Sequence, residues 1–220
     1  MDTEELRVAI YRWFLEHGTA PTSETLAEIF SSDLPSVRNG LSELATSRHI
    51  VLDENFHILM AHPFSALPLG FSVMGPKALY WGGCSWDSFA LPNLLGAKES
   101  FLIATTCPNC NSALAWNVNS EMPPQGKQLA HFLVPTANMW DDVVHTCGNQ
   151  RIFCSQKCID SWMTKTGNTQ GYVMDLETLW NLASGWYQGR LERGYVRREP
   201  SAAKDYFRKV GLSGTFWGLD

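Results

Sequence analysis

The chain has 220 residues, of which 45% are hydrophobic and 18% charged, and it contains nine Trp and eleven Phe. This composition excludes a disordered or fibrous protein, and a chain of this length can form one or two hydrophobic cores. The formal net charge is −5, from 17 basic and 22 acidic residues, which argues against a protein that binds nucleic acid by neutralising many phosphates.

The N-terminal residues Met1 to Glu5 are acidic where an export signal is basic. No segment approaches the roughly 20 uninterrupted apolar residues that a membrane span requires. We therefore expect a cytoplasmic protein with neither a membrane nor a nucleic acid as its partner. In that reducing compartment the six cysteines are more often thiols or metal ligands than disulfides.

The first third of the chain has the pattern of three helices and a hairpin. Apolar residues recur at helical spacing over residues 3–17, and two further helices are predicted after the caps Thr22 and Asp33. The apolar stretches 50–52 and 56–59 flank a short polar turn, which is typical of a β-hairpin. Three helices followed by a hairpin predict a winged helix-turn-helix.

We assign this winged-helix-like helical domain to residues 1–62. Its charge argues against DNA binding, because residues 1–60 hold four basic side chains against ten acidic ones. We prefer a helical cap that packs on a second domain, residues 63–220. A metal-responsive regulator, in which the winged helix reads DNA, is retained as an alternative.

The second domain alternates short strands with helices, which predicts an α+β fold with a mixed α/β core and C-terminal helices. The expected strands are residues 71–74, 78–81, 101–105, 114–118 and 131–134. The expected helices are residues 155–166, 175–190 and 201–209.

A cysteine and an aspartate mark the most reactive segment. The strand that ends at Trp81 runs through two glycines, which places Cys84 at a helix N-terminus. The helix dipole favours a thiolate there. Asp87 lies three residues later on the same face of the first turn, close enough to exchange a proton with a group that the sulfur holds. Taken alone, the pair also fits a buried cysteine and an ordinary capping acid.

The segment that contains this pair resembles the core signature of the organomercurial (alkylmercury) lyases. The match covers residues 79–96 and includes Tyr80, Cys84, Asp87, Pro92 and Gly96. Cys107 falls where that family keeps a structural cysteine, and Cys154, after Ile152 and Phe153, resembles its second catalytic thiol. The resemblance extends over most of residues 1–165, including the N-terminal winged helix.

The resemblance implies that Cys84 and Cys154 bind the mercury of a small organometallic substrate while Asp87 protonates the departing carbon. The products are a hydrocarbon and Hg(II), which passes to cellular thiols or to a mercury-handling partner. Thiolates suit this role because mercury is a soft cation. An exposed aspartic acid is almost fully ionised at pH 7, so we expect Asp87 to be buried against Trp86 and Phe89. The lyase reaction requires no cofactor.

A second interpretation uses four of the cysteines differently. The pair Cys107 and Cys110 and the pair Cys154 and Cys158 have the spacing of a treble-clef zinc site, with four thiolates available for tetrahedral coordination. Cys154 would then be a structural zinc ligand, and the chain would be a catalytically divergent family member with other thiol chemistry or binding only. Cys147 is spare in both interpretations, either as a buried cysteine or as an additional thiol on the metal path.

The remaining polar residues receive no catalytic role from the sequence. The six histidines show neither H-x-x-x-H nor H-E-x-x-H spacing, which argues against a histidine-zinc hydrolase, and we expect the histidines to be structural. Asp141 and Asp142 are adjacent and are expected in a solvated turn.

Overall fold

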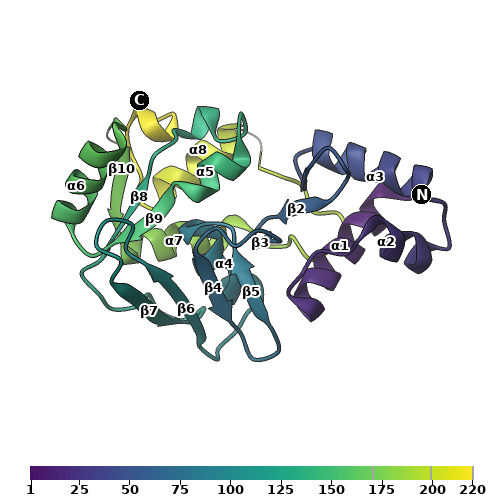
Figure 1. The fold of residues 1–220 in the computed structure, drawn as a ribbon, viewed down its shortest axis with the longest axis horizontal. Coiled ribbons are helices and arrows are strands. Elements are labelled where there is room, and N and C mark those ends of the chain that lie inside the picture. The colour runs from purple at the N-terminus through teal and green to yellow at the C-terminus, as the bar shows by residue number, and fades with distance from the viewer. Residues whose placement is uncertain (170, 199, 220) are drawn as a thin grey trace.

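The computed structural model describes residues 1–169, 171–198 and 200–219, and these ranges contain eight α-helices and two antiparallel sheets. Three helices lie at one end of the molecule, whereas most of the sheet structure and the other helices form the opposite end (Figure 1). This arrangement confirms the predicted mixed α+β class. In the described ranges, no helix has the length and apolarity needed to cross a membrane.

The three N-terminal helices begin at side-chain caps because each is preceded by a residue whose oxygen can accept from the first turn. They are α1 (Thr3–His17), α2 (Ser23–Phe30) and α3 (Leu34–Thr46), with the caps Asp2, Thr22 and Asp33. Helix α3 packs against both α1 and α2. The hairpin that follows pairs β1 (Val51–Leu52) with β2 (Ile58–Ala61), so its second strand lies slightly later in the chain than the sequence predicted.

This hairpin is the start of a larger antiparallel sheet. The strand order is β1-β2-β3-β5-β4-β6-β7, and Met60 in β2 pairs with Ser65 in β3 across the join between the helical region and the rest. The other strands are β3 (Phe64–Ser65), β4 (Phe71–Met74), β5 (Leu79–Gly82), β6 (Phe101–Thr106) and β7 (Ala113–Val118). Side chains in β6 and β7 alternate between buried and exposed positions, so one face of the sheet is covered.

The covering element nearest the centre is α4 (Ser85–Leu94), which packs against β4, β5 and α7 (Leu176–Trp186). Its first eight residues, 85–92, are all buried. Cys84 immediately precedes this helix, so the sequence that follows β5 carries the cysteine directly into the core.

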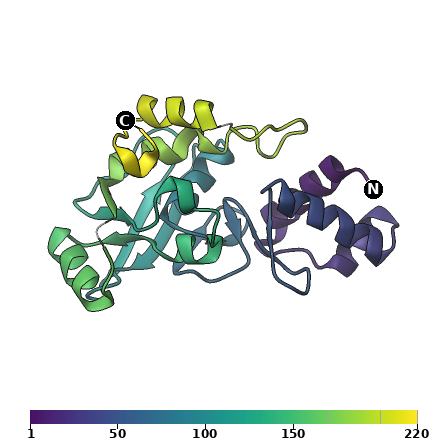
Figure 2. The same cartoon turned by 90° about the horizontal axis from the view of Figure 1, so that it is seen from above.

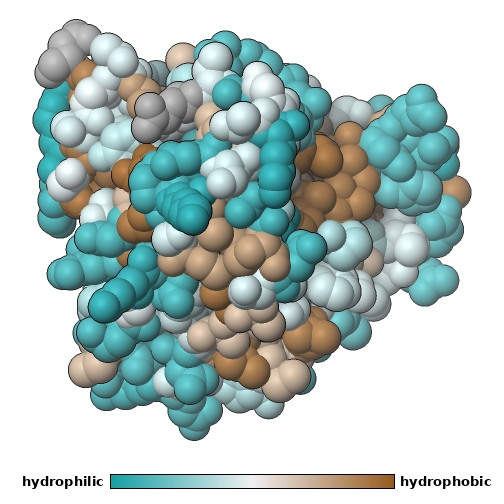
Figure 3. All heavy atoms as spheres, turned by 60° about the vertical axis from the view of Figure 1, so that its left-hand side comes forward, coloured by the Kyte–Doolittle hydropathy of each residue, from teal (hydrophilic) through white to brown (hydrophobic). Residues whose placement is uncertain are grey.

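A smaller sheet completes the fold, with strand order β10-β8-β9. Its strands are β8 (Leu129–Phe132), β9 (Gln150–Phe153) and β10 (Tyr172–Asp175), and the nearby helices are α5 (Val143–Gly148), α6 (Gln156–Thr166) and α8 (Pro200–Lys209). The sequence did not predict β9, β10 or α5. Figure 3 shows a surface of mixed hydropathy, on which apolar residues gather beside the hydrophilic right-hand part and again below the centre of the view.

The helix predicted for residues 175–190 ends earlier, at Trp186. Residues 187–198 are turns and coil, and in Figure 2 this segment leaves the body and extends toward the N-terminal helices. We call residues 187–198 the strap.

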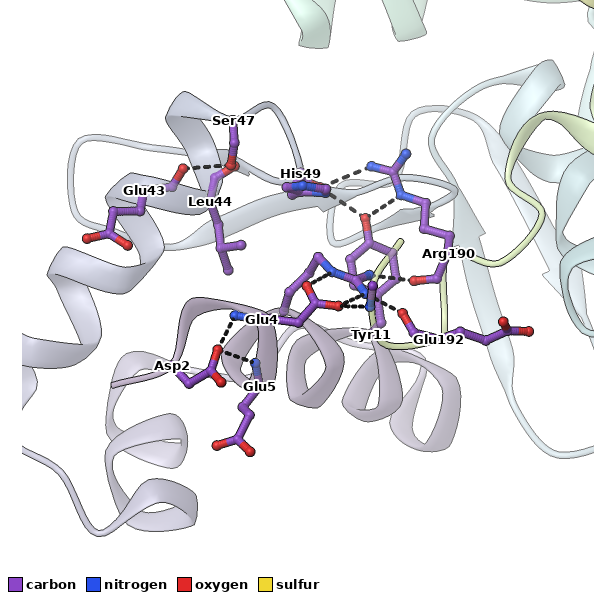
Figure 4. A network of polar contacts seen from close by, with 12 residues as sticks. Asp2, Glu4, Glu5, Tyr11, Glu43, Leu44, Ser47, His49, Arg190 and Glu192 are labelled. Atoms are coloured by element: carbon purple, nitrogen blue, oxygen red, sulfur yellow. Dashed lines mark hydrogen bonds and ion pairs between the residues drawn. The ribbon is translucent and has the colours of Figure 1, made fainter. Parts of the chain in front are cut away.

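A polar network holds the strap to α1 (Figure 4). The fully buried guanidinium of Arg7 pairs with Glu4 and donates to the backbone carbonyls of Arg190 and Glu192. Arg190 in turn donates from Nε to the Tyr11 hydroxyl at 2.7 Å. The Arg7 hydrogen bond lowers the pKa of Glu4 to about 2. A buried charge is tolerated here because it is paired and hydrogen-bonded.

Candidate active site

Cys84 lies at the N-terminus of α4, as the sequence predicted. It is the N-cap residue, and its sulfur accepts a hydrogen bond from the backbone N–H of Asp87 at 3.4 Å. Two glycines before it allow a close approach, since an added Cβ at Gly83 would lie 2.6 Å from the Asp87 carboxylate and one at Gly82 would overlap Ser88. The Cys84 side chain is buried.

The carboxyl of Asp87 is held inside the protein by two side chains. Only 1% of Asp87 is exposed. The Tyr187 hydroxyl donates to Oδ1 at 2.6 Å, and His62 Nδ1 lies 3.1 Å from Oδ2. Burial, followed by the charge of Asp87, raises the pKa of Tyr187 well above its ordinary value, so this hydroxyl remains a donor. Asp87 thus has the shielding that a proton donor requires.

The second thiol beside Cys84 belongs to Cys147. Asp142, which the sequence left in a solvated turn, accepts from the backbone N–H of His145 and caps α5. Helix α5 carries Cys147 into the core, where its sulfur and ligand atoms of His62 and Asp87 all lie within 4.8 Å of one another. Cys84 and Cys147 line the same cavity, and the Cys147 thiol is near enough to contribute to raising the pKa of Cys84.

The structure does not bring Cys154 to this site, although the sequence analysis expected it there. Its sulfur lies 3.6 Å from that of Cys110, in a cluster with Cys107 and Cys158. Cys154 follows β9 and precedes the first turn of α6, and this turn faces the β6–β7 hairpin that carries Cys107 and Cys110. The four-cysteine grouping predicted from spacing is therefore the one that the fold assembles.

Both site thiols favour their protonated form. Burial raises the pKa of Cys84 well above its ordinary value, and the neighbouring Cys147 and Asp87 add to this effect. The neighbouring Cys84 thiol lowers the pKa of Cys147, but burial and the charge of Asp87 together outweigh this effect and leave that pKa raised. The expectation that the helix N-terminus would make Cys84 a thiolate is thus corrected, because desolvation exceeds the dipole.

These groups line one cavity of about 720 Å³. Its wall contains seven aromatic side chains, namely Trp86, Trp140, Trp186, Tyr187, Tyr195, Phe207 and Trp217. Its lining also includes cationic side chains, among them Arg48 and Arg197, whose guanidinium carbons lie 5.7 and 4.7 Å from the ring centre of Trp140. The strap contributes Tyr187, Arg190, Tyr195, Arg197 and Arg198 to the lining. Two soft sulfur ligands thus share a cavity with aromatic and cationic side chains.

The fold and the site define a protein with a paired-thiol centre suited to a soft metal. The sequence profile described as "MerB: Alkylmercury lyase" matches residues 64–188, and the chain belongs to the alkylmercury lyase family. Its fold is similar to the crystal structure of the mercury-bound form of MerB2, with a TM-score of 0.67, 18% sequence identity, and coverage of 87% of this chain and 92% of that chain. No protein of curated function matches the sequence.

Sequence reasoning missed two residues that shape the site, His62 and Tyr187, and gave Cys147 only as a buried cysteine or an additional thiol on the metal path. One signal was available for Cys147, since assigning the other pairs to a four-cysteine cluster leaves only this cysteine to partner Cys84. His62 and Tyr187 are 25 and 100 residues from Asp87, and no local pattern connects either with it.

Proposed function

We propose that this protein is an alkylmercury lyase that protonates a carbon–mercury bond and releases a hydrocarbon and Hg(II). The observation that carries the proposal is the convergence of two buried thiols, Cys84 and Cys147, with the buried carboxyl of Asp87 in one aromatic-walled cavity. Family membership supports the reaction class. Cys147 takes the place that the sequence analysis gave to Cys154, because the Cys154 sulfur lies in the four-cysteine cluster.

The reaction uses both thiol protons. A substrate R–Hg–X, where X is a small thiolate, enters the cavity and the Cys84 sulfur displaces X, which leaves as the thiol HX. The Cys147 sulfur then bonds to mercury while its proton passes through Asp87 to the carbon of R. The carbon–mercury bond breaks, R–H departs, and mercury remains bound to two sulfurs. Two soft donors stabilise the product and increase the basicity of the carbon.

Raised thiol pKa values are compatible with this sequence of steps. In the resting site the sulfurs keep their protons, and bonding to mercury drives each proton off because the metal replaces it on sulfur. A neutral pair of thiols costs less to bury than two thiolates beside a carboxylate. The site is therefore stable before substrate arrives and contains the proton that the carbon needs.

Tyr187 and His62 position Asp87 for the transfer. While Asp87 is ionised, the Tyr187 O–H and a His62 Nδ1–H can donate to separate carboxylate oxygens. Once Oδ2 carries a proton, the other tautomer of His62 can accept from it at Nδ1. The carboxyl group thus keeps its orientation in both protonation states, as preorganised catalysis requires.

The surroundings suggest how substrate and product are handled. Aromatic walls accommodate the organic group R, and we propose that cellular thiols or a mercury-handling partner remove Hg(II) by ligand exchange in the cytoplasm. The lyase reaction itself uses no cofactor.

We propose that residues 1–62 form a winged-helix-like cap on an alkylmercury-lyase-like domain of residues 63–220. The cap's role is structural, since α1 holds the strap that lines the cavity, and nucleic acid is not a partner. A gel shift at low salt, where phosphate attraction is greatest, checks this: retarded duplex DNA would favour the regulator instead.

The activity test measures hydrocarbon release. Benzene released from phenylmercury in the presence of excess small thiol is followed by gas chromatography for the wild type, Cys84→Ser, Cys147→Ser and Asp87→Ala. We expect each variant to lose at least a hundredfold in rate. Ser42→Ala, a change on the exposed face of α3, serves as a matched control and should keep the wild-type rate.

Cys154→Ser separates the two candidate thiols. If this variant folds and retains measurable benzene release while Cys147→Ser does not, the assignment stands. Loss in Cys154→Ser with full activity in Cys147→Ser would overturn it.

A further inference from the structure

A second cysteine cluster lies outside the catalytic cavity. It consists of Cys107, Cys110, Cys154 and Cys158, none of which lines that cavity. We propose that these four thiolates hold one structural zinc ion that joins the two sheets. This inference is independent of the lyase reaction.

The geometry of the cluster fits tetrahedral coordination. A zinc ion with Zn–S bonds of about 2.3 Å separates its sulfur ligands by about 3.8 Å. The Cys110 sulfur lies 3.6 Å from that of Cys154 and 4.0 Å from that of Cys158. All four sulfurs lie within 4.8 Å of one another. These separations are far longer than a disulfide bond of about 2.05 Å, and the cysteines are free thiols.

The first pair of ligands is carried by a preformed turn between β6 and β7. The backbone N–H of Asn111 donates to the Cys107 carbonyl at 2.9 Å, and the N–H of Cys107 donates to the Ser112 carbonyl at 3.0 Å. Asn111 adopts a left-handed conformation, with φ of 58°, which asparagine tolerates better than most residues. This tight turn presents both sulfurs on one side without further rearrangement.

The second pair is carried by the start of α6. Cys154 follows β9, and Cys158 lies in the first turn of the helix, where its N–H donates to the Ser155 carbonyl at 3.0 Å. A direct contact aligns this helix with the other pair, since Lys165 Nζ donates to Asn109 Oδ1 at 2.8 Å. Two elements from different sheets therefore meet at the four sulfurs.

Helix α6 is held mainly by partly buried side chains, among them Trp162 and Met163. Among its eleven residues only Ile159 is buried, although Trp162 also packs against Phe153 with ring centres 5.4 Å apart. A zinc ion would add four metal–sulfur bonds that join the start of α6 to the turn between β6 and β7. The ligand set favours a structural role, because four cysteines close the coordination sphere and leave no position for substrate.

The ligand chemistry also selects the metal. Four thiolates without an oxygen or imidazole donor favour a soft or borderline cation over magnesium or calcium, and a tetrahedral four-sulfur site is typical of zinc. Cys154 is then occupied in the folded protein, which leaves Cys84 and Cys147 as the thiols free to bind mercury.

The full-length protein, expressed with zinc in the medium and purified without chelator, tests the proposal. Elemental analysis should give about one zinc per chain. Cys110→Ser and Cys154→Ser should each reduce the zinc content at least fivefold, whereas the paired variant Cys84→Ser/Cys147→Ser should retain it. Zinc that stayed with both cluster variants and left with the paired variant would overturn the assignment.

Cobalt substitution keeps the test decisive if a cluster variant fails to fold. Wild-type protein stripped of zinc and given Co(II) should develop thiolate charge-transfer bands and the intense visible bands of a tetrahedral site, and one equivalent of zinc should abolish them. Octahedral Co(II) spectra, or wild-type protein that neither carries zinc nor binds either metal, would refute the site.

Discussion

Replacing Arg7 by Met should destabilise the protein through the contact between α1 and the strap. Arg7 is fully buried, and its guanidinium bonds to both carboxylate oxygens of Glu4 and to two backbone carbonyls of the strap. Methionine fills similar space but donates no hydrogen bond. The variant therefore leaves two carbonyls without the Arg7 donor, and leaves the partly buried Glu4 carboxylate with the N–H of Gly194 but without the guanidinium.

The magnitude follows from two contributions. The hydrogen bond to Arg7 is the main reason that the pKa of Glu4 falls from 4.5 to about 2, a change that corresponds to about 3 kcal/mol. The Glu4 side chain is 34% exposed, so we halve this figure to about 1.5 kcal/mol for solvent screening. The two orphaned carbonyls add about 1 kcal/mol each. We expect a loss of about 3 to 4 kcal/mol at pH 7.

A double-mutant cycle measures the coupling between Arg7 and Glu4, using urea denaturation of the wild type, Arg7→Met, Glu4→Gln and the double variant. Because folding lowers the pKa of Glu4, its contribution is present above pH 4.5 and is lost as the pH falls toward 2. The difference in unfolding free energy between wild type and Arg7→Met should therefore narrow on acidification. A loss below 1 kcal/mol at pH 7, or a difference that does not change with pH, would refute the reasoning.

Three further outcomes follow from the site and the core. Tyr187→Phe removes the 2.6 Å hydrogen bond to Asp87 and should slow benzene release about 10- to 100-fold and move the pH–rate profile to higher pH; an unchanged profile would contradict its positioning role. Gly83→Ala places a methyl group 2.6 Å from the same carboxylate and should lower the rate with little change in circular dichroism. Burial lowers the pKa of His131 from 6.5 to about 4. The free energy of unfolding of the wild type should therefore fall by about 2 kcal/mol between pH 6.5 and pH 4. In urea denaturation, His131→Gln should show a smaller fall over that range.

Local signals were sufficient for much of the fold. Side-chain caps located the three N-terminal helices, short strand-like segments bounded by glycine and proline located β4 and β6, and the paired glycines located Cys84 at the start of α4. These features depend on neighbours within a few residues, which is the range over which capping, periodicity and turn preferences act.

Long-range placement could not be obtained in the same way. Strands β9 and β10 were missed because each has only four residues, and β10 pairs with β8 across the intervening β9 and α6. The choice between Cys147 and Cys154 depends on α5 entering the core, and α5 is only six residues long. The sequence predicted a thiolate at Cys84, whereas burial favours the protonated thiol. This difference has a related cause, because the burial of a side chain depends on the assembled core and cannot be inferred from its position at a helix N-terminus.

The contact between α1 and the strap also bears on how the chain is made. The helix that buries Arg7 is synthesised before the carbonyls that satisfy its charge, because Arg190 and Glu192 lie 183 and 185 residues later in the chain. A nascent chain therefore leaves the Arg7 guanidinium without two of its acceptors until the strap has emerged. The reactive sulfurs gain the part of their enclosure that the strap supplies only at that point.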